Sequence, residues 1–214
     1  MDKPVNSKCF FMFALQKECG LEVIKGLVEG DKNLSRIFGF VLYTDKDPYV
    51  AKVLRDEDFW KSLDSISGDN WPIFAVRPME KGYYQYSGGG KNSIGFMVQT
   101  WVEPKDNLTI IHDFGIEGTN ELPLFVAFMW DDNDNLNEVT VPIEGKNTDE
   151  VYESLREIVD AITRVEAAIW PEYKQSENVF RNVESELKAI KAKRRLVKGG
   201  NIAKKFYDFF SVFI

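Results

Sequence analysis

Two short apolar runs separated by an amphipathic stretch place the strongest constraint on how this chain folds. Ile37–Tyr43 and Trp71–Val76 have the length and near-continuous hydrophobicity typical of strands buried on both faces. Between them, residues 50–54 and 59–66 repeat apolar side chains at helical spacing. This order of strand, helix and strand predicts a crossover connection with its two strands parallel.

The second half of the chain predicts an antiparallel hairpin followed by a helix. Leu122–Trp130 is a strongly apolar run, a turn rich in Asp and Asn follows it, and Glu138–Ile143 returns as its partner. Residues 149–169 then carry an apolar stripe at helical spacing, with Asn147 or Thr148 as the N-cap. A mixed α/β fold follows from these elements together.

Composition limits the class of protein. The chain has 214 residues, of which 44% are hydrophobic and 14% aromatic, which suffices for a sizeable core and excludes an intrinsically disordered chain. Two cysteines cannot staple a chain of this length, which excludes a disulfide scaffold. No window reaches the roughly 18 apolar residues of a membrane span, and the run Cys9–Leu15 lacks a signal cleavage site. We therefore expect a cytoplasmic protein.

One stretch resembles the thioredoxin-like superfamily. Phe114-Gly115-Ile116, followed by Pro123 at the start of an apolar strand, is similar to the family's pattern, with residues 119–122 added before the proline. The order of elements is also similar, over roughly residues 37–169 apart from a weakly patterned stretch at 78–106. The resemblance implies a thioredoxin-like three-layer sandwich with a mixed sheet. It also implies a cis Leu122–Pro123 peptide bond.

Around that core we expect an inserted segment near residues 78–106, predicted as a flexible hairpin, and a helical C-terminal extension. The chain then divides into a thioredoxin-like α/β domain at residues 1–169 and a basic helical extension at residues 170–214.

The resemblance departs from the family where its chemistry is found. The loop Thr44–Ala51 occupies the place of the family's Cys-x-x-Cys but contains no cysteine, and disulfide exchange needs a thiolate there. We therefore expect the fold without redox activity. The candidate binding residues around this loop are Thr44, Asp45, Asp47 and Pro123.

The C-terminal extension differs in charge from the rest of the chain. The net charge is −7, yet residues 187–205 hold eight cations and no acid, so the rest of the chain carries −15. A helix there is predicted to end at Gly199-Gly200, and aromatic residues follow it. The candidate binding residues in this region are Lys191, Arg194, Arg195, Lys198, Phe206, Phe209 and Phe210.

Four interpretations of this basic segment remain open. It is a solvated helix face with cations near the helix C-terminus, or it docks on acidic protein, either a partner or the chain's own body. It also has the polybasic and aromatic pattern of a segment that binds an anionic membrane surface. Nucleic acid is the least favoured partner, because the acidic body repels phosphate.

Other candidate chemistry is weak. His112 is the only histidine and lacks a nucleophile motif, so we assign it a structural role. The turn that begins at Asp131 has Leu136 and Pro142 where a calcium loop needs Gly and Glu. We therefore predict no catalytic residue, no metal and no cofactor.

These observations predict a non-catalytic thioredoxin-like module that binds a protein partner or a second copy of itself. One alternative is a thiol-dependent enzyme that uses Cys9 or Cys19. A second alternative is a peripheral membrane protein attached through the basic and aromatic C-terminus.

Overall fold

The computed structural model describes most of the chain from residue 37 onward. The described residues are 21, 25, 37–44, 46–67, 71, 73–75, 79–86, 96–102, 110–116, 121–169 and 177–211. Side chains are described for all of these except residues 60, 64, 79–86, 96–102, 177 and 198–211. Asp45, Cys9 and Cys19 lie outside the described residues.

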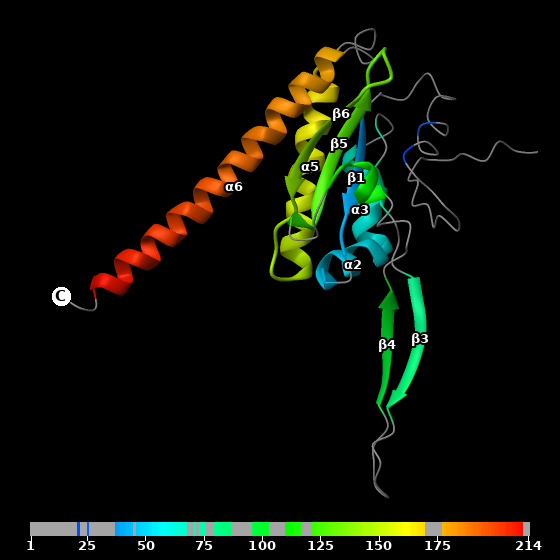
Figure 1. The fold of residues 1–214 in the computed structure, drawn as a ribbon, viewed down its shortest axis with the longest axis vertical. Coiled ribbons are helices and arrows are strands. Elements are labelled where there is room, and N and C mark those ends of the chain that lie inside the picture. Colours follow the sequence, from blue (N-terminus) through cyan, green and yellow to red (C-terminus); the bar gives the residue numbers. More distant parts are fainter. Residues whose placement is uncertain are drawn as a thin grey trace, which may run out of the picture.

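The centre of the fold is a four-stranded mixed sheet in the order β2-β1-β5-β6 (Figure 1). β1 (Phe38–Leu42) pairs in parallel with β2 (Ile73–Ala75), as the crossover pattern predicts. β5 (Leu124–Trp130) pairs antiparallel with both β1 and β6 (Leu136–Pro142). The predicted hairpin is thus confirmed, and the fold is mixed α/β.

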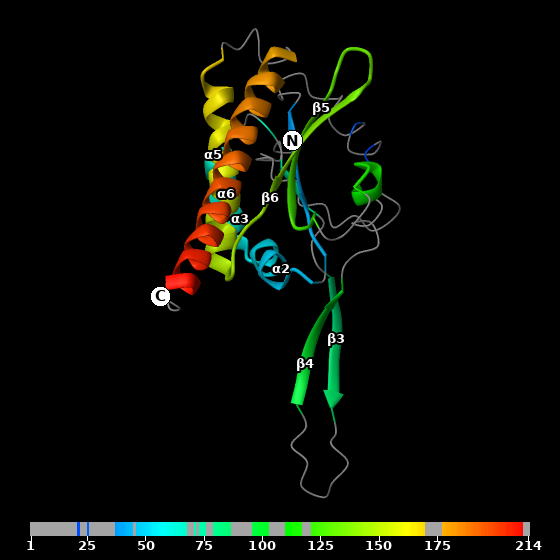
Figure 2. The same cartoon turned by 60° about the vertical axis from the view of Figure 1, so that its left-hand side comes forward.

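The stretch predicted as an insertion forms a separate two-stranded ribbon. β3 (Met79–Tyr86) and β4 (Phe96–Val102) pair antiparallel with each other and form their own sheet. The ribbon projects away from the central sheet (Figures 1 and 2).

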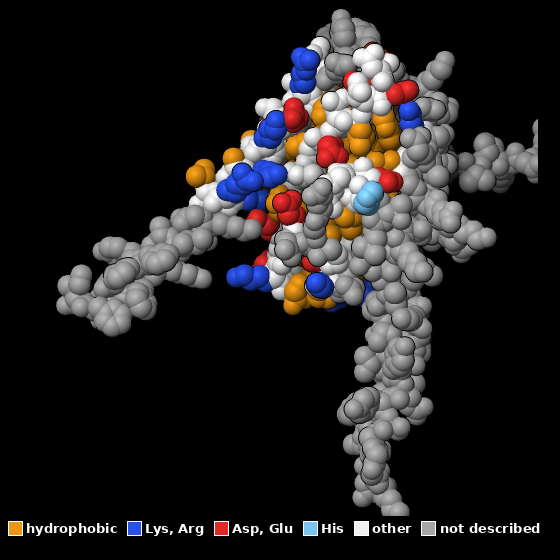
Figure 3. Space-filling view, in the orientation of Figure 1, with side chains coloured by type: hydrophobic (Ala, Val, Ile, Leu, Met, Phe, Trp, Pro, Cys, Tyr) orange, Lys and Arg blue, Asp and Glu red, His pale blue; other side chains and the backbone are white. Residues whose placement is uncertain are grey.

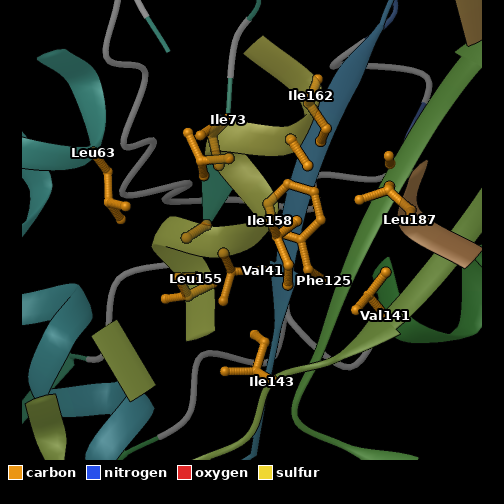
Figure 4. Close-up of a cluster of buried hydrophobic side chains, with 14 of the residues drawn as sticks. Val41, Leu63, Ile73, Phe125, Val141, Ile143, Leu155, Ile158, Ile162 and Leu187 are labelled. Atoms are coloured by element: carbon orange, nitrogen blue, oxygen red, sulfur yellow. The ribbon is translucent and has the colours of Figure 1, made fainter. Parts of the chain in front are cut away.

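Alternation along the strands divides the core between the two faces of the central sheet. One face carries Val41, Phe125 and Val141 and is covered by four helices (Figure 4). These helices are α2 (Pro48–Arg55), α3 (Glu57–Ser67), α5 (Thr148–Ala167) and α6 (Glu177–Ser211). The other face carries Phe40 and Phe128, and the segment 110–114 and residue 21 pack against it.

A glycine allows the sheet to pack tightly against the helical layer. A Cβ on Gly39 would clash with the ring of Phe125 and lie 2.9 Å from a ring carbon of Trp71. Both rings are nearly fully buried and cannot move without disturbing the core. Only glycine leaves room for them at this position.

The predicted start of α5 is confirmed, and α3 begins with a similar side-chain cap. The Asn147 side chain accepts a hydrogen bond from the backbone N–H of Glu150 at 2.9 Å, and so caps α5. Asp56 similarly accepts from the N–H of Asp58 at 3.0 Å at the start of α3.

The predicted end of the last helix at Gly199-Gly200 is wrong, because α6 continues to Ser211. Glycine costs a helix about 1 kcal/mol relative to alanine but does not stop it unless the backbone turns left-handed. Ala203, Lys204 and Lys205 follow the pair and favour helix, so the helix continues.

The first half of α6 belongs to the main core. Val179, Phe180, Val183, Leu187 and Ile190 are buried in the same cluster as α5 and the sheet. Val197, farther along the same helix, is 58% exposed. The predicted boundary after residue 169 therefore separates two helices that share one core.

Candidate functional site

The loop after β1 and the start of β5 lie at the same end of neighbouring strands. Leu42 pairs with Leu124, so Thr44 and Pro123 lie just beyond that end of the sheet, on adjacent strands. The Leu122–Pro123 peptide bond is cis, as the resemblance implied. Two of the predicted site residues are therefore close neighbours.

Thr44 and Asp47 are hydrogen-bonded to each other within this loop. The backbone N–H and the hydroxyl of Thr44 both donate to Oδ2 of Asp47, at 2.8 and 2.9 Å. Thr44 is 4% exposed, and α2 begins directly after Asp47 with Pro48 in its first turn. The loop is a closed turn whose hydroxyl is already engaged.

Arg194, a predicted binding residue, instead holds α6 against the rest of the molecule. Its guanidinium donates to the backbone carbonyls of Pro142 and Ser154, the second at 3.1 Å, and to Glu157 Oε2 at 2.8 Å. Lys193 Nζ lies 3.1 Å from the other oxygen of Glu157. The Arg194 side chain is only 10% exposed. The Arg194 guanidinium therefore binds acceptors of its own chain.

The contact with Arg194 and Lys193 changes the pKa of the Glu157 carboxyl. Burial alone would raise the pKa of the Glu157 carboxyl, but the hydrogen bonds and positive charges of Arg194 and Lys193 outweigh burial and hold that pKa below its ordinary value. Part of the basic segment thus docks on the chain's own acidic body, which is one of the interpretations that the sequence left open.

Three of the predicted residues, including Pro123, meet at one cavity. Pro123, Lys191 and Arg195 all line a partly open cavity of about 640 Å³ between the β5 and β6 strands, the β6–α5 loop and α6. The remaining lining residues are Glu121, Leu122, Leu124, Thr140, Pro142, Ile143, Glu144, Gly145, Lys146 and Glu150. Sequence reasoning did not identify Thr140 or Lys146, since neither belongs to a motif and only the packing of α6 beside β6 brings them to the cavity.

The last half of α6 extends beyond the body of the protein (Figures 1 and 2). Lys and Arg side chains run along its described part (Figure 3). Leu196 is 77% exposed there, beside the exposed Val197. Lys198, Phe206, Phe209 and Phe210 lie on this helix, but their side chains are outside the described set.

Within the described part of the chain, neither His112 nor the Asp131 turn belongs to a group of metal ligands. His112 is exposed at a short helical turn. Asp131 instead accepts hydrogen bonds from the backbone N–H groups of Asn133 and Asn135, at 2.9 and 2.8 Å, which closes the turn. Among the described residues, no group of three or more His, Cys, Asp and Glu side chains is arranged to hold a metal ion.

Within the part of the chain that the structure describes, no helix combines the length and apolar character needed to cross a membrane. Comparisons with protein-family models, curated proteins and solved structures found no match for this chain. Its function must therefore be inferred from its own residues.

Proposed function

We propose that this protein is a non-catalytic, thioredoxin-like binding module whose projecting C-terminal helix contacts a protein partner or a second copy of the chain. The thioredoxin-like part is supported by the strand order β2-β1-β5-β6, with one parallel and two antiparallel pairings. Four helices cover one face of the sheet, a short helical turn at residues 110–113 packs against the other, and the β1 loop is adjacent to Pro123. These features agree with the resemblance of the sequence.

The state of the β1 loop supports a role without catalysis at that position. A nucleophile there would need a thiolate or an activated hydroxyl. The Thr44 hydroxyl is buried and donates to Asp47, and Asp47 also accepts the Thr44 backbone N–H. A carboxylate engaged in this way stabilises the turn rather than activating an exposed oxygen.

The observation that carries the proposal is the division of α6 into a packed half and a projecting half. Phe180 to Ile190 are anchored in the core, whereas Leu196 and Val197 are exposed on a helix that continues to Ser211. A helix of 35 residues spans about 50 Å. Long isolated helix ends are marginally stable in water, because most helix stability comes from packing. A partner that covers this end would provide that packing.

Light scattering and quantitative capture from the native host test this proposal. Full-length protein is compared with a version that ends at Gly199 and with the full-length double variant Leu196→Glu/Val197→Glu. We expect both changes to abolish self-association or capture of a specific partner. Tyr49→Glu is the matched control, because Tyr49 is the third large exposed apolar residue among those described, at 43%, and lies on α2.

Unfolding curves confirm that each version keeps the folded body. Unchanged association in the truncated protein would contradict the proposal. Sedimentation with anionic lipid vesicles that requires residues 200–214 would instead favour the membrane alternative.

A further inference from the structure

One side of the cavity beside α6 is lined by cations that have few hydrogen-bond or ion-pair partners among the described residues. Lys191 and Arg195 are one turn apart on the same face of α6, and Lys146 reaches the cavity from the β6–α5 loop. Among the described residues, the side chains of Arg195 and Lys146 have no partner. Lys191 has only a long contact of 3.4 Å with the Thr140 hydroxyl.

Arg194, the preceding residue of α6, differs because its hydrogen bonds are made within the protein. It is nearly buried and donates to two carbonyls and one carboxylate. Its neighbour Arg195 is exposed and turned to the cavity. The two adjacent arginines therefore differ in role, and the one at the cavity is available to a ligand.

The acidic residues of the cavity limit what kind of anion fits. Glu150 is already occupied, since its carboxylate accepts from the Lys146 backbone N–H at 2.8 Å and from the Asn147 amide at 2.9 Å. Glu121 and Glu144 also line the cavity, so three carboxylates balance three cations. A near-neutral lining favours a ligand with a single anionic group over a polyanion with several, which would be repelled by the carboxylates.

Part of the lining is apolar and can hold the uncharged part of such a ligand. Leu122, Pro123, Pro142 and Ile143 supply this surface. A volume of about 640 Å³ lies in the range of small-molecule sites, which combine apolar walls with a few placed polar groups.

We propose that this cavity binds an organic oxyanion, a carboxylate or phosphate monoester carried on a small apolar body, with Lys191, Arg195 and Lys146 holding the anionic group. Arg195 is suited to bidentate contact with either oxyanion, and the two lysines act as point charges. The site does not depend on the partner contact proposed above, since every residue that lines it precedes Gly199.

NMR titration of the full-length, ¹⁵N-labelled protein with benzoate, phenyl phosphate and inorganic phosphate tests the site. We expect benzoate and phenyl phosphate to shift amide signals of residues 121–124, 140–146 and 191–195. Inorganic phosphate should bind more weakly than phenyl phosphate, because it lacks the apolar body. Lys191→Gln/Arg195→Gln should weaken binding of both organic anions by about tenfold or more, as expected when charged hydrogen bonds are lost.

The double variant Lys52→Gln/Lys188→Gln is the matched control. It removes the same net charge from exposed residues that do not line the cavity, one on α2 and one on α6. Equal weakening in the control would show nonspecific attraction and overturn the site. Signal changes confined to other residues, or no binding of either organic anion, would also overturn it. If phenyl phosphate and inorganic phosphate bound equally well, the apolar residues of the cavity would not contribute to binding, and that part of the proposal would be overturned.

Discussion

Replacing Arg194 tests how the projecting helix is held to the core. In Arg194→Met the side chain keeps an unbranched apolar stem but loses the guanidinium with its charge and donors. The carbonyls of Pro142 and Ser154 and one oxygen of Glu157 then lose the guanidinium. We expect the variant to be less stable than the wild type, with α6 loosened from α5 and β6.

The magnitude follows from these three acceptors. A hydrogen bond to a charged group contributes about 1.5–3 kcal/mol when buried. The Glu157 side chain is 38% exposed and keeps Lys193, so its loss is screened and contributes little. The two carbonyls dominate, and we expect a loss of about 3 kcal/mol in the free energy of unfolding. For a chain of this size, that corresponds to a fall of roughly 10 °C in the melting temperature.

Urea unfolding followed by circular dichroism measures this loss. Lys193→Met is the control, because Lys193 binds the same carboxylate but is 72% exposed, and an exposed pair contributes less than about 1 kcal/mol. Arg194→Lys should recover only part of the stability, since an ammonium cannot reach three acceptors with the geometry of a guanidinium. If Arg194→Met costs no more than Lys193→Met, the assigned role of Arg194 is wrong.

Three further predictions concern stability. Gly39→Ala should cost about 1–3 kcal/mol in urea unfolding, because its Cβ would clash with the rings of Phe125 and Trp71; an unchanged midpoint would contradict this packing. Asn147→Ala should cost about 1 kcal/mol through loss of the α5 cap, and Asn147→Asp, which keeps an acceptor, should restore most of it. Because the pKa of Glu157 is lowered in the folded protein, its contribution is present above the ordinary glutamate pKa of about 4.3 and is lost as the pH falls through the lowered pKa. The stability of Glu157→Gln, measured from pH 7 to 3, should therefore fall less steeply than that of the wild type; parallel curves would contradict this assignment.

Much of the central fold could be predicted because its signals are local. The runs at Ile37–Tyr43 and Leu122–Trp130 are apolar enough to specify buried strands wherever they lie. The turn between β5 and β6 is short, so these strands had to pair antiparallel. The N-cap of α5 at Asn147 depends on a few adjacent residues.

The course of the last helix could not be predicted in the same way. Gly199-Gly200 has the local signature of a helix end, yet α6 passes through it. A glycine pair permits a turn without requiring one, and the helix-favouring residues on both sides decide between the two outcomes.

By itself, the sequence determined the central strands, most of the helices and the contrast between an acidic body and a basic C-terminal segment. Only the tertiary structure decided what each cation does: Arg194 is bound within the protein, while Arg195, the next residue, faces a cavity. The reason is physical. Helical residues one position apart point about 100° from each other, and their roles depend on contacts with Pro142, Ser154 and Glu157, which lie far away along the chain. No pattern of neighbouring residues encodes such contacts, because they exist only once α6 packs beside β6 and α5.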